Sequence, residues 1–429
     1  MNDESANARS RILDDLSARG LRHDNTDEAT LRARLAAGPI TLYCGFDPTA
    51  DSLHVGNLVG LLALRRFQLA GHNPIVLAGG GTGLVGDPSG KSDERNLLDA
   101  QRLAENLAGV GPQLELLLDF SASNAARLVD NADWLGGLSL IAFLRDTAKH
   151  FTVNQLVARE SVRARMNSES GISFTEFSYG LLQAYDFAEL HRRFSCELQI
   201  GGSDQWGNIV GGIDLIRKTS AAAAYGLTWP LLTRADGKKY GKTEDGAVWL
   251  SARRTSRYQF FQYWVNLPDA AITSALLTFS LRPLDELRAV VETHEKAPEQ
   301  RHAQRELARE MTDMIHGSGA GGDCAAAAAV AFGSAASSAA ALEMLVDELP
   351  TRRVAQVEGL GVVDLLVSLG SVGSKGEARR AIQGGGVRLG GRKVESIDES
   401  VTAADVEYGR FVLVRRGKRD VRLVVQGVA

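Results

Sequence analysis

The stretch "ITLYCGFDPTADSLHVGNLVGLLALRRFQLAG", Ile40 to Gly71, carries the strongest signal for the fold class of this chain. Its first seven residues have the apolar character of a buried strand, and a turn containing a proline follows them. From about Ser52 the apolar spacing is that of an amphipathic helix, which ends at Gly71. A second strand follows in "NPIVLAGGGTGLVGD". This order of strand, loop, helix and strand predicts an α/β fold with a Rossmann-like parallel sheet.

The pattern changes twice along the 429 residues, a length that suggests more than one hydrophobic core. Strands and helices alternate up to about residue 250. The segments from 251 to 350 read as helices with a flexible connection at "GSGAGGD" (317–323), and 351–429 has a compact α+β pattern. We therefore predict a catalytic sheet domain over 1–250, an α-helical domain over 251–350 and a small α+β domain over 351–429.

Composition excludes several classes of protein. Hydrophobic residues make up 44% of the chain and the net charge is −4, as in soluble globular proteins. The sequence contains no apolar run of about 18 residues and no signal-peptide pattern at the N-terminus, so we expect a cytoplasmic protein without a membrane span. The three cysteines have no C-x-x-C spacing, which argues against a disulfide framework or a cysteine zinc site, and we expect no protein metal site.

The charge is unevenly distributed. Residues 351–429 contain 14 Lys and Arg against 9 Asp and Glu, whereas the remainder contains 34 against 43. A basic tail on an acidic body favours a polyanionic partner for the tail. An ordinary solvated surface would explain the charge alone equally well.

The segment "GLVGDPSGKS" (83–92) is not a phosphate-binding P-loop. That motif would require a glycine at Val85, but the glycine is Gly86, and Pro88 removes a backbone donor. A different site carries the signal for anion binding, because Thr49, His54 and Asn57 surround the start of the helix that follows the first strand. A lone helical histidine is more often structural, but the three polar residues together favour a ligand site.

Two further clusters suggest a pocket. Tyr179, Gln183 and Asp186 lie at i, i+4 and i+7 of a largely apolar helix, so they share one face. They form either a structural hydrogen-bond network or a pocket wall that recognises a polar molecule. "QIGGSDQWGN" places glycines and polar side chains at the end of a strand, where parallel sheets bind ligands. The lysines of "ADGKKYGKTEDG" are compatible with a solvated basic turn when taken alone.

Taken together, these motifs resemble those of a known family. "DPTADSLHVGNL" resembles the HIGH signature of class I aminoacyl-tRNA synthetases, and "KYGKT" (239–243) resembles their KMSKS loop. With "GDPSGKS", "FSYGLLQAYDF" and "QIGGSDQWGN", the chain resembles bacterial-type tyrosyl-tRNA synthetases over essentially its whole length. "SKGEARRAIQGGGVRLGGRKV" resembles their terminal S4-like RNA-binding module. Two positions depart from the motifs: Asn57 replaces the second histidine of HIGH, and Tyr240-Gly241 replace the Met-Ser of KMSKS.

The resemblance implies a two-step reaction and its participants. ATP and L-tyrosine would give tyrosyl-AMP and pyrophosphate, with Mg²⁺ bound through ATP, and the tyrosyl group would then pass to the 3′ end of tRNA(Tyr). The helical domain would bind the anticodon, and the chain would form a homodimer around residues 150–179. Three rivals stay open at this stage: the tryptophan enzyme, a catalytically silent RNA-binding paralogue and another nucleotidyltransferase.

The resemblance also implies roles for individual residues. Tyr43 and Asp186 would bind the phenol hydroxyl, and Asp87, Tyr179 and Gln183 the ammonium group. The ribose and carboxylate side would fall to Gly45, Asp47, Gly202, Asp204 and Gln205. Those expected at the phosphates are Thr49, His54, Asn57, Lys91, Arg95, Lys239, Lys242 and Thr243, and those expected at tRNA phosphates are Lys375, Arg379, Arg380 and Arg388.

Overall fold

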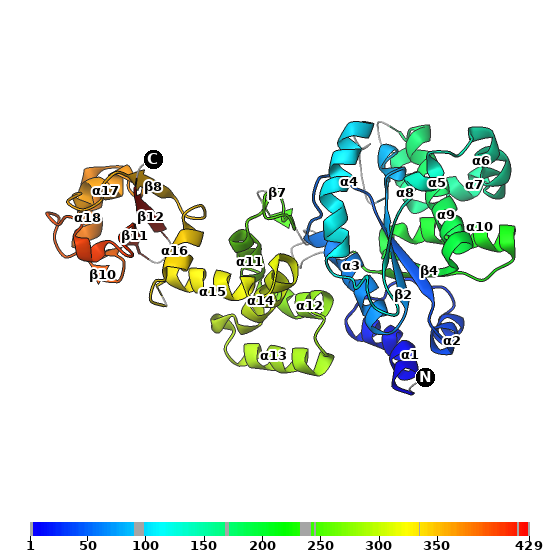
Figure 1. The fold of residues 1–429 in the computed structure, drawn as a ribbon, viewed down its shortest axis with the longest axis horizontal. Helices are drawn as coiled ribbons and strands as arrows, with labels where there is room; N and C mark the ends of the chain where they lie inside the picture. Colours follow the sequence, from blue (N-terminus) through cyan, green and yellow to red (C-terminus); the bar gives the residue numbers. More distant parts are fainter. Residues whose placement is uncertain are drawn as a thin grey trace. The chain divides into compact units, whose positions relative to one another are not determined.

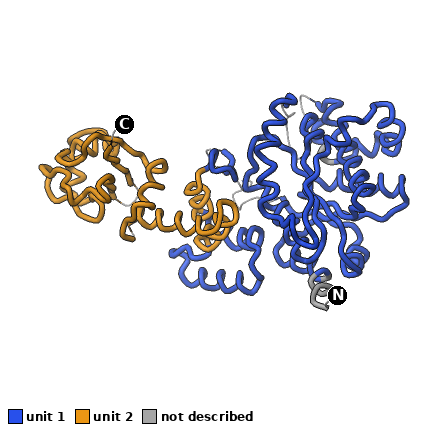
Figure 2. Tube along the Cα trace, in the orientation of Figure 1, with its two compact units in different colours: residues 1–255, 267–303 blue, residues 256–266, 304–429 orange. Residues whose placement is uncertain are grey.

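The computed structural model describes residues 3–89, 98–167, 171–231, 242–243, 246–333, 335–417 and 420–427. It divides into two compact units (Figure 2). Unit 1 comprises residues 1–255 and 267–303, and unit 2 comprises 256–266 and 304–429. The three-domain division with boundaries near 250 and 350 stays a prediction. None of the helices in the described ranges is both long enough and apolar enough to cross a membrane.

A parallel sheet of five strands forms the centre of unit 1, which confirms the Rossmann-like fold class (Figure 1). Its order is β3-β2-β1-β4-β5, and every neighbouring pair is parallel. Because β1 lies between β2 and β4, the strand order reverses beside it, and this arrangement opens a crevice at the carboxyl ends of the strands. The strands are β1 (Thr41–Phe46), β2 (Asn73–Ala78), β3 (Arg127–Asp130), β4 (Cys196–Gly202) and β5 (Tyr225–Trp229).

Helices cover both faces of this sheet. On one face, α3 (Val55–Leu69) approaches β1 so closely that a Cβ at Gly60 would lie 3.1 Å from the Phe46 ring. On the other face, Phe187 of α9 (Phe174–Phe194) packs against Tyr43, with ring centroids 5.3 Å apart. The remaining helices of unit 1 are α1 (Asp3–Ala18), α2 (Glu28–Ala37), α4 (Ala100–Glu115), α5 (Ala132–Leu135), α6 (Leu140–Asp146), α7 (Val153–Val157), α8 (Glu160–Met166), α10 (Trp206–Ser220), α12 (Asp269–Phe279) and α13 (Leu284–Lys296), with short 3₁₀ turns η1 (Thr82–Leu84), η2 (Ala148–His150), η3 (Ser203–Gln205) and η4 (Pro298–Gln300).

Helix α3 starts later than the sequence pattern predicts. The apolar spacing suggested a start at Ser52, but His54 is the N-cap, with extended backbone angles of φ −122° and ψ 170°. The preceding residue is held outside the helix because its N–H donates to Gln113 Oε1 at 2.8 Å, and the carbonyl of Leu53 accepts from Leu250 N at 2.9 Å. Periodicity cannot reveal such a competing partner.

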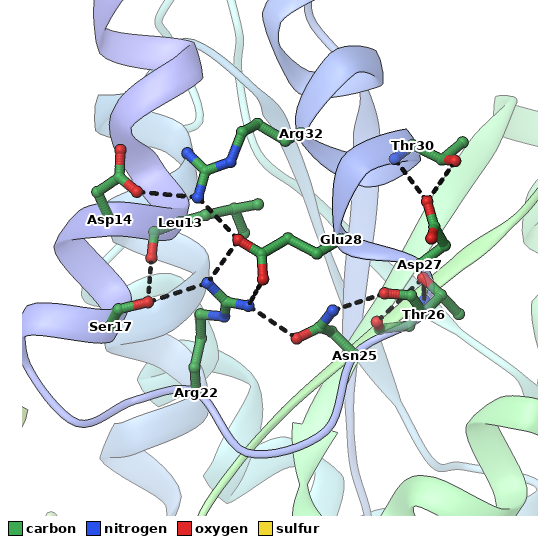
Figure 3. A network of polar contacts seen from close by, with 11 residues as sticks. Leu13, Asp14, Ser17, Arg22, Asn25, Thr26, Asp27, Glu28, Thr30 and Arg32 are labelled. Atoms are coloured by element: carbon green, nitrogen blue, oxygen red, sulfur yellow. Dashed lines mark hydrogen bonds and ion pairs between the residues drawn. The ribbon is translucent and has the colours of Figure 1, made fainter.

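Polar contacts fix the N-terminal helices to one another (Figure 3). Arg22 Nη2 donates to Glu28 Oε2 at 2.7 Å, and Arg32 bonds both Glu28 and Asp14, so α1 and α2 share one network. Asp27 caps α2 by accepting from Thr30 N at 2.8 Å. The hydrogen bonds from Arg22 and Arg32, with the charges of the two arginines, lower the pKa of Glu28 to about 2. Exposed pairs of this kind contribute little stability each.

Two arginines attach residues 267–303 to the rest of unit 1. Arg19 donates to the carbonyls of Ser280 at 3.0 Å and Arg282 at 2.8 Å. Arg66 donates to those of Thr278 at 2.7 Å and Ser280 at 2.8 Å. The last carbonyls of α12 have no partner within the helix, and the two guanidinium groups satisfy them.

Unit 2 combines helices with a small mixed sheet, which confirms the predicted helical region followed by an α+β region. Its five strands have the order β10-β9-β11-β12-β8. Alternate residues of β11 face opposite sides, Val412 and Val414 toward one core and Phe411 and Leu413 toward another. The elements are α11 (Arg257–Val265), α14 (His302–His316, in this unit from residue 304), α15 (Ala320–Ala331), α16 (Ala339–Leu345), β8 (Thr351–Val354), α17 (Val362–Ser368), α18 (Lys375–Gln383), β9 (Val387–Leu389), β10 (Arg392–Lys393), η5 (Ala403–Asp405), β11 (Phe411–Arg416) and β12 (Asp420–Gln426).

The predicted flexible connection at 317–323 is wrong in its second half. Helix α14 does stop before Gly317, which has a positive φ of 100°, but α15 already begins at Ala320. A Cβ at Gly321 would lie 2.6 Å from the carbonyl oxygen of Arg309. The glycine therefore allows the close approach of two helix backbones here and is not a sign of flexibility.

Candidate active site

A cavity of about 420 Å³ lies at the carboxyl ends of β1 and β4, where the strand order reverses. Its walls come from the turn after β1, the start of α3, the inward face of α9 and the glycine turn after β4. The volume lies within the range of small-molecule sites. Of the predicted site residues, those that line it are Tyr43, Gly45, Asp47, Thr49, His54, Asn57, Asp87, Tyr179, Gln183, Asp186, Gly202, Asp204 and Gln205.

The N-terminus of α3 forms one wall. Asn57 is the third residue of the helix, and its Oδ1 accepts from the backbone N of His54 at 3.0 Å. This contact stabilises the first turn as in a capping box. Thr49, which is exposed in the turn after β1, completes the polar rim. Together with the partial positive charge of a helix N-terminus, this wall suits an anion.

Backbone hydrogen bonds join the start of α3 to the segment that follows the KMSKS-like motif. Val55 N donates to Val248 O, and Leu250 N donates to Leu53 O, both at 2.9 Å. Directly before this segment, β6 (Lys242–Thr243) pairs antiparallel with β7 (Gly246–Ala247). The start of α3 and residues 248–250, almost 200 residues apart in the sequence, are therefore neighbours in unit 1. The predicted residues Lys91, Arg95 and Lys239 lie outside the described residues.

The deep end of the cavity is built around a hydroxyl and a carboxyl group. Tyr43 is 1% exposed, and its Oη has no hydrogen-bond partner among the described residues. Asp186 is 2% exposed and accepts from Trp134 Nε1 at 2.7 Å and from Asn131 Nδ2 at 2.9 Å. Burial raises the pKa of Asp186 to about 7, although these two hydrogen bonds act in the opposite direction. Burial also raises the pKa of Tyr43 well above its usual value, so the phenol stays protonated.

A second polar group lies nearer the glycine turn. Gln183 Nε2 donates to Gln205 Oε1 at 3.2 Å, and Gln205 Nε2 donates to Asp87 Oδ2 at 2.8 Å. Tyr179 Oη donates to Asp47 Oδ2 at 2.8 Å. Carboxylates, amide oxygens and a phenol oxygen that converge in this way can accept hydrogen bonds from a cationic ammonium group.

Several cavity residues escaped the sequence analysis. Asn131 bonds Asp186, and it also donates to Thr82 Oγ1 at 2.9 Å and accepts from Gly81 N at 2.7 Å. Thr82 in turn donates to Asp47 Oδ1 at 2.9 Å. Nothing near "VDNADWL" marks Asn131 or Trp134 as special, because their carboxylate partner lies more than 50 residues away. A buried polar residue is recognisable only once its partner is known.

The four residues predicted to contact tRNA all lie on the surface of unit 2. Lys375, Arg379 and Arg380 are on α18 and Arg388 is on β9, and all four side chains are exposed. Lys375 forms an exposed ion pair with Asp364 at 2.6 Å. The basic residues are therefore solvent-accessible.

The raised pKa of Asp186 predicts a stability effect that depends on pH. Its pKa is about 7 in the folded chain against about 4 when unfolded, so folding is disfavoured increasingly from pH 4 to pH 7 and by a constant amount above pH 7. We expect the melting temperature of Asp186→Asn, relative to that of the unsubstituted chain, to rise over this interval. Thermal unfolding of both proteins at pH 4.5, 6 and 8 (about half a unit above the unfolded pKa and on either side of the folded pKa) measures this difference. A difference that does not change with pH would contradict the assignment.

Comparisons with known proteins identify the family. A family model described as "tRNA synthetases class I (W and Y)" matches residues 35–333. A second model, described as "Tyrosine--tRNA ligase SYY-like C-terminal domain", matches residues 341–424. The first model includes both tryptophan and tyrosine enzymes, whereas the second names the tyrosine enzyme.

Individual relatives agree with the models. The chain is 50% identical over 420 residues to a tyrosine–tRNA ligase of Opitutus terrae, covering 96% of this chain and 99% of the relative. It is 48% identical over 418 residues to one of Anaeromyxobacter dehalogenans, with coverage of 96% and 99%. The crystal structure of a C-terminally truncated mitochondrial tyrosyl-tRNA synthetase from Aspergillus nidulans superposes with a TM-score of 0.67 and 28% identity, covering 75% of this chain and 96% of that chain. The fold, the cavity and these similarities together show that the chain belongs to the tyrosine–tRNA ligases of class I.

Proposed function

We propose that this chain activates L-tyrosine with ATP, releases pyrophosphate, and transfers the tyrosyl group to the 3′ end of tRNA(Tyr). The observation that carries the proposal is the buried Tyr43 hydroxyl, which has no protein partner among the described residues and lies beside the Asp186 carboxyl at the deep end of the cavity. A hydroxyl and a carboxyl offer a donor and an acceptor to a ligand hydroxyl. Phenylalanine would leave the Tyr43 hydroxyl unpaired and would donate nothing to Asp186, and tryptophan would do the same unless its indole N–H reached them.

Neither step of the reaction requires a nucleophile from the protein. A carboxylate oxygen of tyrosine attacks the α-phosphorus of ATP, and the bond to the bridging oxygen breaks, which releases pyrophosphate. A ribose hydroxyl of tRNA then attacks the tyrosyl carbonyl, its proton passes to the leaving phosphate, and AMP departs. Since a carboxylate is already a nucleophile, the protein contributes position and charge stabilisation in the first step.

The start of α3 supports a role for Thr49, His54 and Asn57 at the phosphates, because it provides polar groups at a helix N-terminus inside the cavity. Gly45, Asp47, Gly202 and Asp204 are proposed to bind ribose and the carboxylate side. Lys91 and Arg95, from the segment that begins with "GDPSGKS", and Lys239, Lys242 and Thr243, from "KYGKT", are proposed as phosphate contacts. Mg²⁺ is proposed to arrive bound to the phosphates of ATP, as it commonly does. A cytoplasmic location stays a prediction.

The direct test is ATP–pyrophosphate exchange without tRNA, with tyrosine, phenylalanine and tryptophan offered in parallel. We expect exchange with tyrosine alone. Exchange with tryptophan would refute the assignment of the pocket, and silence with all three from folded protein would refute the proposed activity.

Tyr43→Phe sharpens this test. Because the removed hydroxyl has no partner among the described residues, the substitution leaves no protein group unpaired and the folded chain should keep its stability. The hydrogen bond of this hydroxyl to the substrate should contribute about 0.5–1.5 kcal/mol of binding free energy. Its loss should raise the KM for tyrosine roughly 2- to 10-fold and leave the KM for ATP unchanged. An unchanged ratio of tyrosine to phenylalanine exchange would show that the hydroxyl does not select the substrate.

We also propose a homodimer formed through an apolar surface of unit 1. Phe143 of α6, Leu156 of α7 and Leu181 of α9 pack together inside the unit, so the outer faces of these helices adjoin. Those outer faces expose apolar side chains: Leu140 is 68% exposed, Ile141 70%, Val153 66% and Phe174 76%. A surface of this kind marks a contact with another protein. It extends the segment expected from the sequence, 150–179, back to residue 140.

Substitution with a charge tests the dimer. We expect Phe174→Glu combined with Ile141→Glu to convert a dimer into a monomer, because burying the two carboxylates in an apolar contact is costly. Leu69→Glu is the matched control, since Leu69 is 58% exposed on α3 and should leave the dimer intact. Analytical ultracentrifugation measures the mass, and a monomeric unsubstituted chain at micromolar concentration would refute the proposal.

The exposed basic residues of α18 and β9 are proposed to bind tRNA phosphates. Arg379→Ala with Arg380→Ala should raise the KM for tRNA(Tyr) and weaken the dependence of tRNA binding on salt, because removing one phosphate-binding cation lowers the slope of log K against log[salt] by about 0.9. Tyrosine-dependent pyrophosphate exchange should not change. Arg353→Ala, at an exposed position of β8, is the control. Unchanged charging kinetics and salt dependence in the double variant would remove this surface from tRNA binding.

A further inference from the structure

Arg159 occupies a notch between two helices that carry cavity residues. It is the N-cap residue of α8, and its side chain lies against glycines of α9 and α10. A Cβ at Gly180 would lie 2.3 Å from Arg159 Nη1, and one at Gly211 would lie 2.6 Å from Nη2. Larger residues at these positions would collide with the guanidinium group, so the two glycines make room for it.

The Arg159 side chain is partly buried, and no described side chain forms an ion pair with it. Among the residues whose side chains the structure describes, none provides a carboxylate within ion-pair distance of Arg159, and burial lowers its pKa. Burying a cation in this way costs free energy unless hydrogen bonds offset the cost. The side-chain partner of Arg159 is Asn208, whose Oδ1 accepts from Nη1 at 3.3 Å.

Asn208 connects this cation to the cavity. It is 6% exposed and lies behind the wall formed by Gln183 and Gln205. Its Nδ2 donates to Gln183 Oε1 at 2.9 Å and faces Gln205 Oε1 at 3.4 Å. The series of hydrogen bonds continues as Gln183 Nε2 donates to Gln205 Oε1 and Gln205 Nε2 donates to Asp87 Oδ2.

The groups at the two ends of this series of hydrogen bonds determine the orientation of the amides between them. A guanidinium group can only donate hydrogen bonds, and an ionised carboxylate can only accept them. With Arg159 at one end and Asp87 at the other, all three amides between them must point the same way. Reversing any one amide would place two donors or two acceptors opposite each other.

We propose that Arg159 and Asn208 are positioning residues of the amino-acid site, which hold Gln183, with Gln205 beside it, in the orientation in which the Gln183 amide oxygen accepts a hydrogen bond from the ammonium group of tyrosine. The inference rests on the proposed function, since it requires tyrosine as the substrate, with its ammonium group at Asp87, Tyr179 and Gln183 as the family resemblance implies. Without Arg159, Gln183 can rotate and present its NH₂ group to a cation, which repels it.

Asn208→Asp tests the direction of the hydrogen bonds. The new carboxylate still accepts from Arg159 and forms an ion pair with it, but it has no N–H to donate to Gln183. If Gln183 and Gln205 both rotate in response, the mismatch passes to Asp87. We expect the KM for tyrosine in pyrophosphate exchange to rise about 10-fold, with the KM for ATP within twofold and the melting temperature not lowered. An unchanged KM for tyrosine would overturn the inference.

Arg159 variants provide an independent test that does not depend on the stability of Asn208→Asp. Arg159→Met keeps much of the side-chain volume and removes the donor, so the KM for tyrosine should rise about 10-fold. Arg159→Lys keeps a donor and should recover part of the loss. Arg217→Met, at an exposed position of α10, is the control and should change neither KM. Equal KM values for tyrosine in the Met and Lys variants would overturn the inference.

Substrate analogues separate an effect on the ammonium site from a general distortion of the cavity. Tyramine has the ammonium group without the carboxylate, and 3-(4-hydroxyphenyl)propionate has the carboxylate without the ammonium group. In Asn208→Asp and Arg159→Met, the inhibition constant of tyramine should rise by the same factor as the KM for tyrosine, and that of the propionate should stay within twofold. Equal weakening of both analogues would overturn the inference. If the unsubstituted chain shows no tyrosine-dependent exchange, the proposed function itself fails.

Discussion

The burial of the Asp186 carboxyl is the constraint on which the cavity depends. A buried carboxyl group needs hydrogen-bond donors, and here they come from Asn131 and Trp134, directly after β3. Asn131 also bonds the glycine turn after β2, and Thr82 in that turn bonds Asp47 after β1. The ends of three adjacent strands are thereby joined beneath one helix. The requirements of a single buried group fix the geometry of the whole deep end.

On the side of the cavity formed by Gln183 and Gln205, hydrogen-bond partners determine which way each amide group points. Carboxyl groups accept hydrogen bonds from several directions, whereas an amide has a donor end and an acceptor end that differ. The amides of Gln183 and Gln205 keep one orientation only if groups at both ends of the series fix it. Arg159, which can only donate, and the Asp87 carboxylate, which accepts, are those groups. The close packing of α9 on α10 is part of this arrangement, because its glycines leave space for the guanidinium group.

Backbone hydrogen bonds connect the cavity wall at the start of α3 to a distant segment of unit 1. The start of α3 pairs with residues 248–250, and β6 and β7 directly precede that segment. This backbone pairing fixes residues 248–250 against the helix N-terminus that lines the cavity.

The features that depend on local order could be predicted from the sequence. The strand, turn and helix of 40–71 predicted the parallel sheet, and the span from Tyr179 to Asp186 placed three polar side chains on one helix face. Predicted site residues from four separate segments, which are the turn after β1, the start of α3, α9 and the turn after β4, line one cavity. These signals lie within a few residues of one another, so the geometry of a helix or strand suffices to interpret them.

The features that depend on distant partners required the tertiary structure. Asn131, Trp134 and Arg159 had no sequence signal, and Asn208 received no role although it ends the motif "QIGGSDQWGN". Each acquires its role from a residue about 50 positions away or from a neighbouring helix. The start of α3 at Val55 and of α15 at Ala320 also departed from the local pattern, since Gln113 and the backbone of Arg309 act on those positions from elsewhere in the fold. A polar side chain or a glycine has no fixed meaning until the fold places another group opposite it. The physical reason is that the cost of burial is offset by contacts in space, which the order of residues along the chain does not contain.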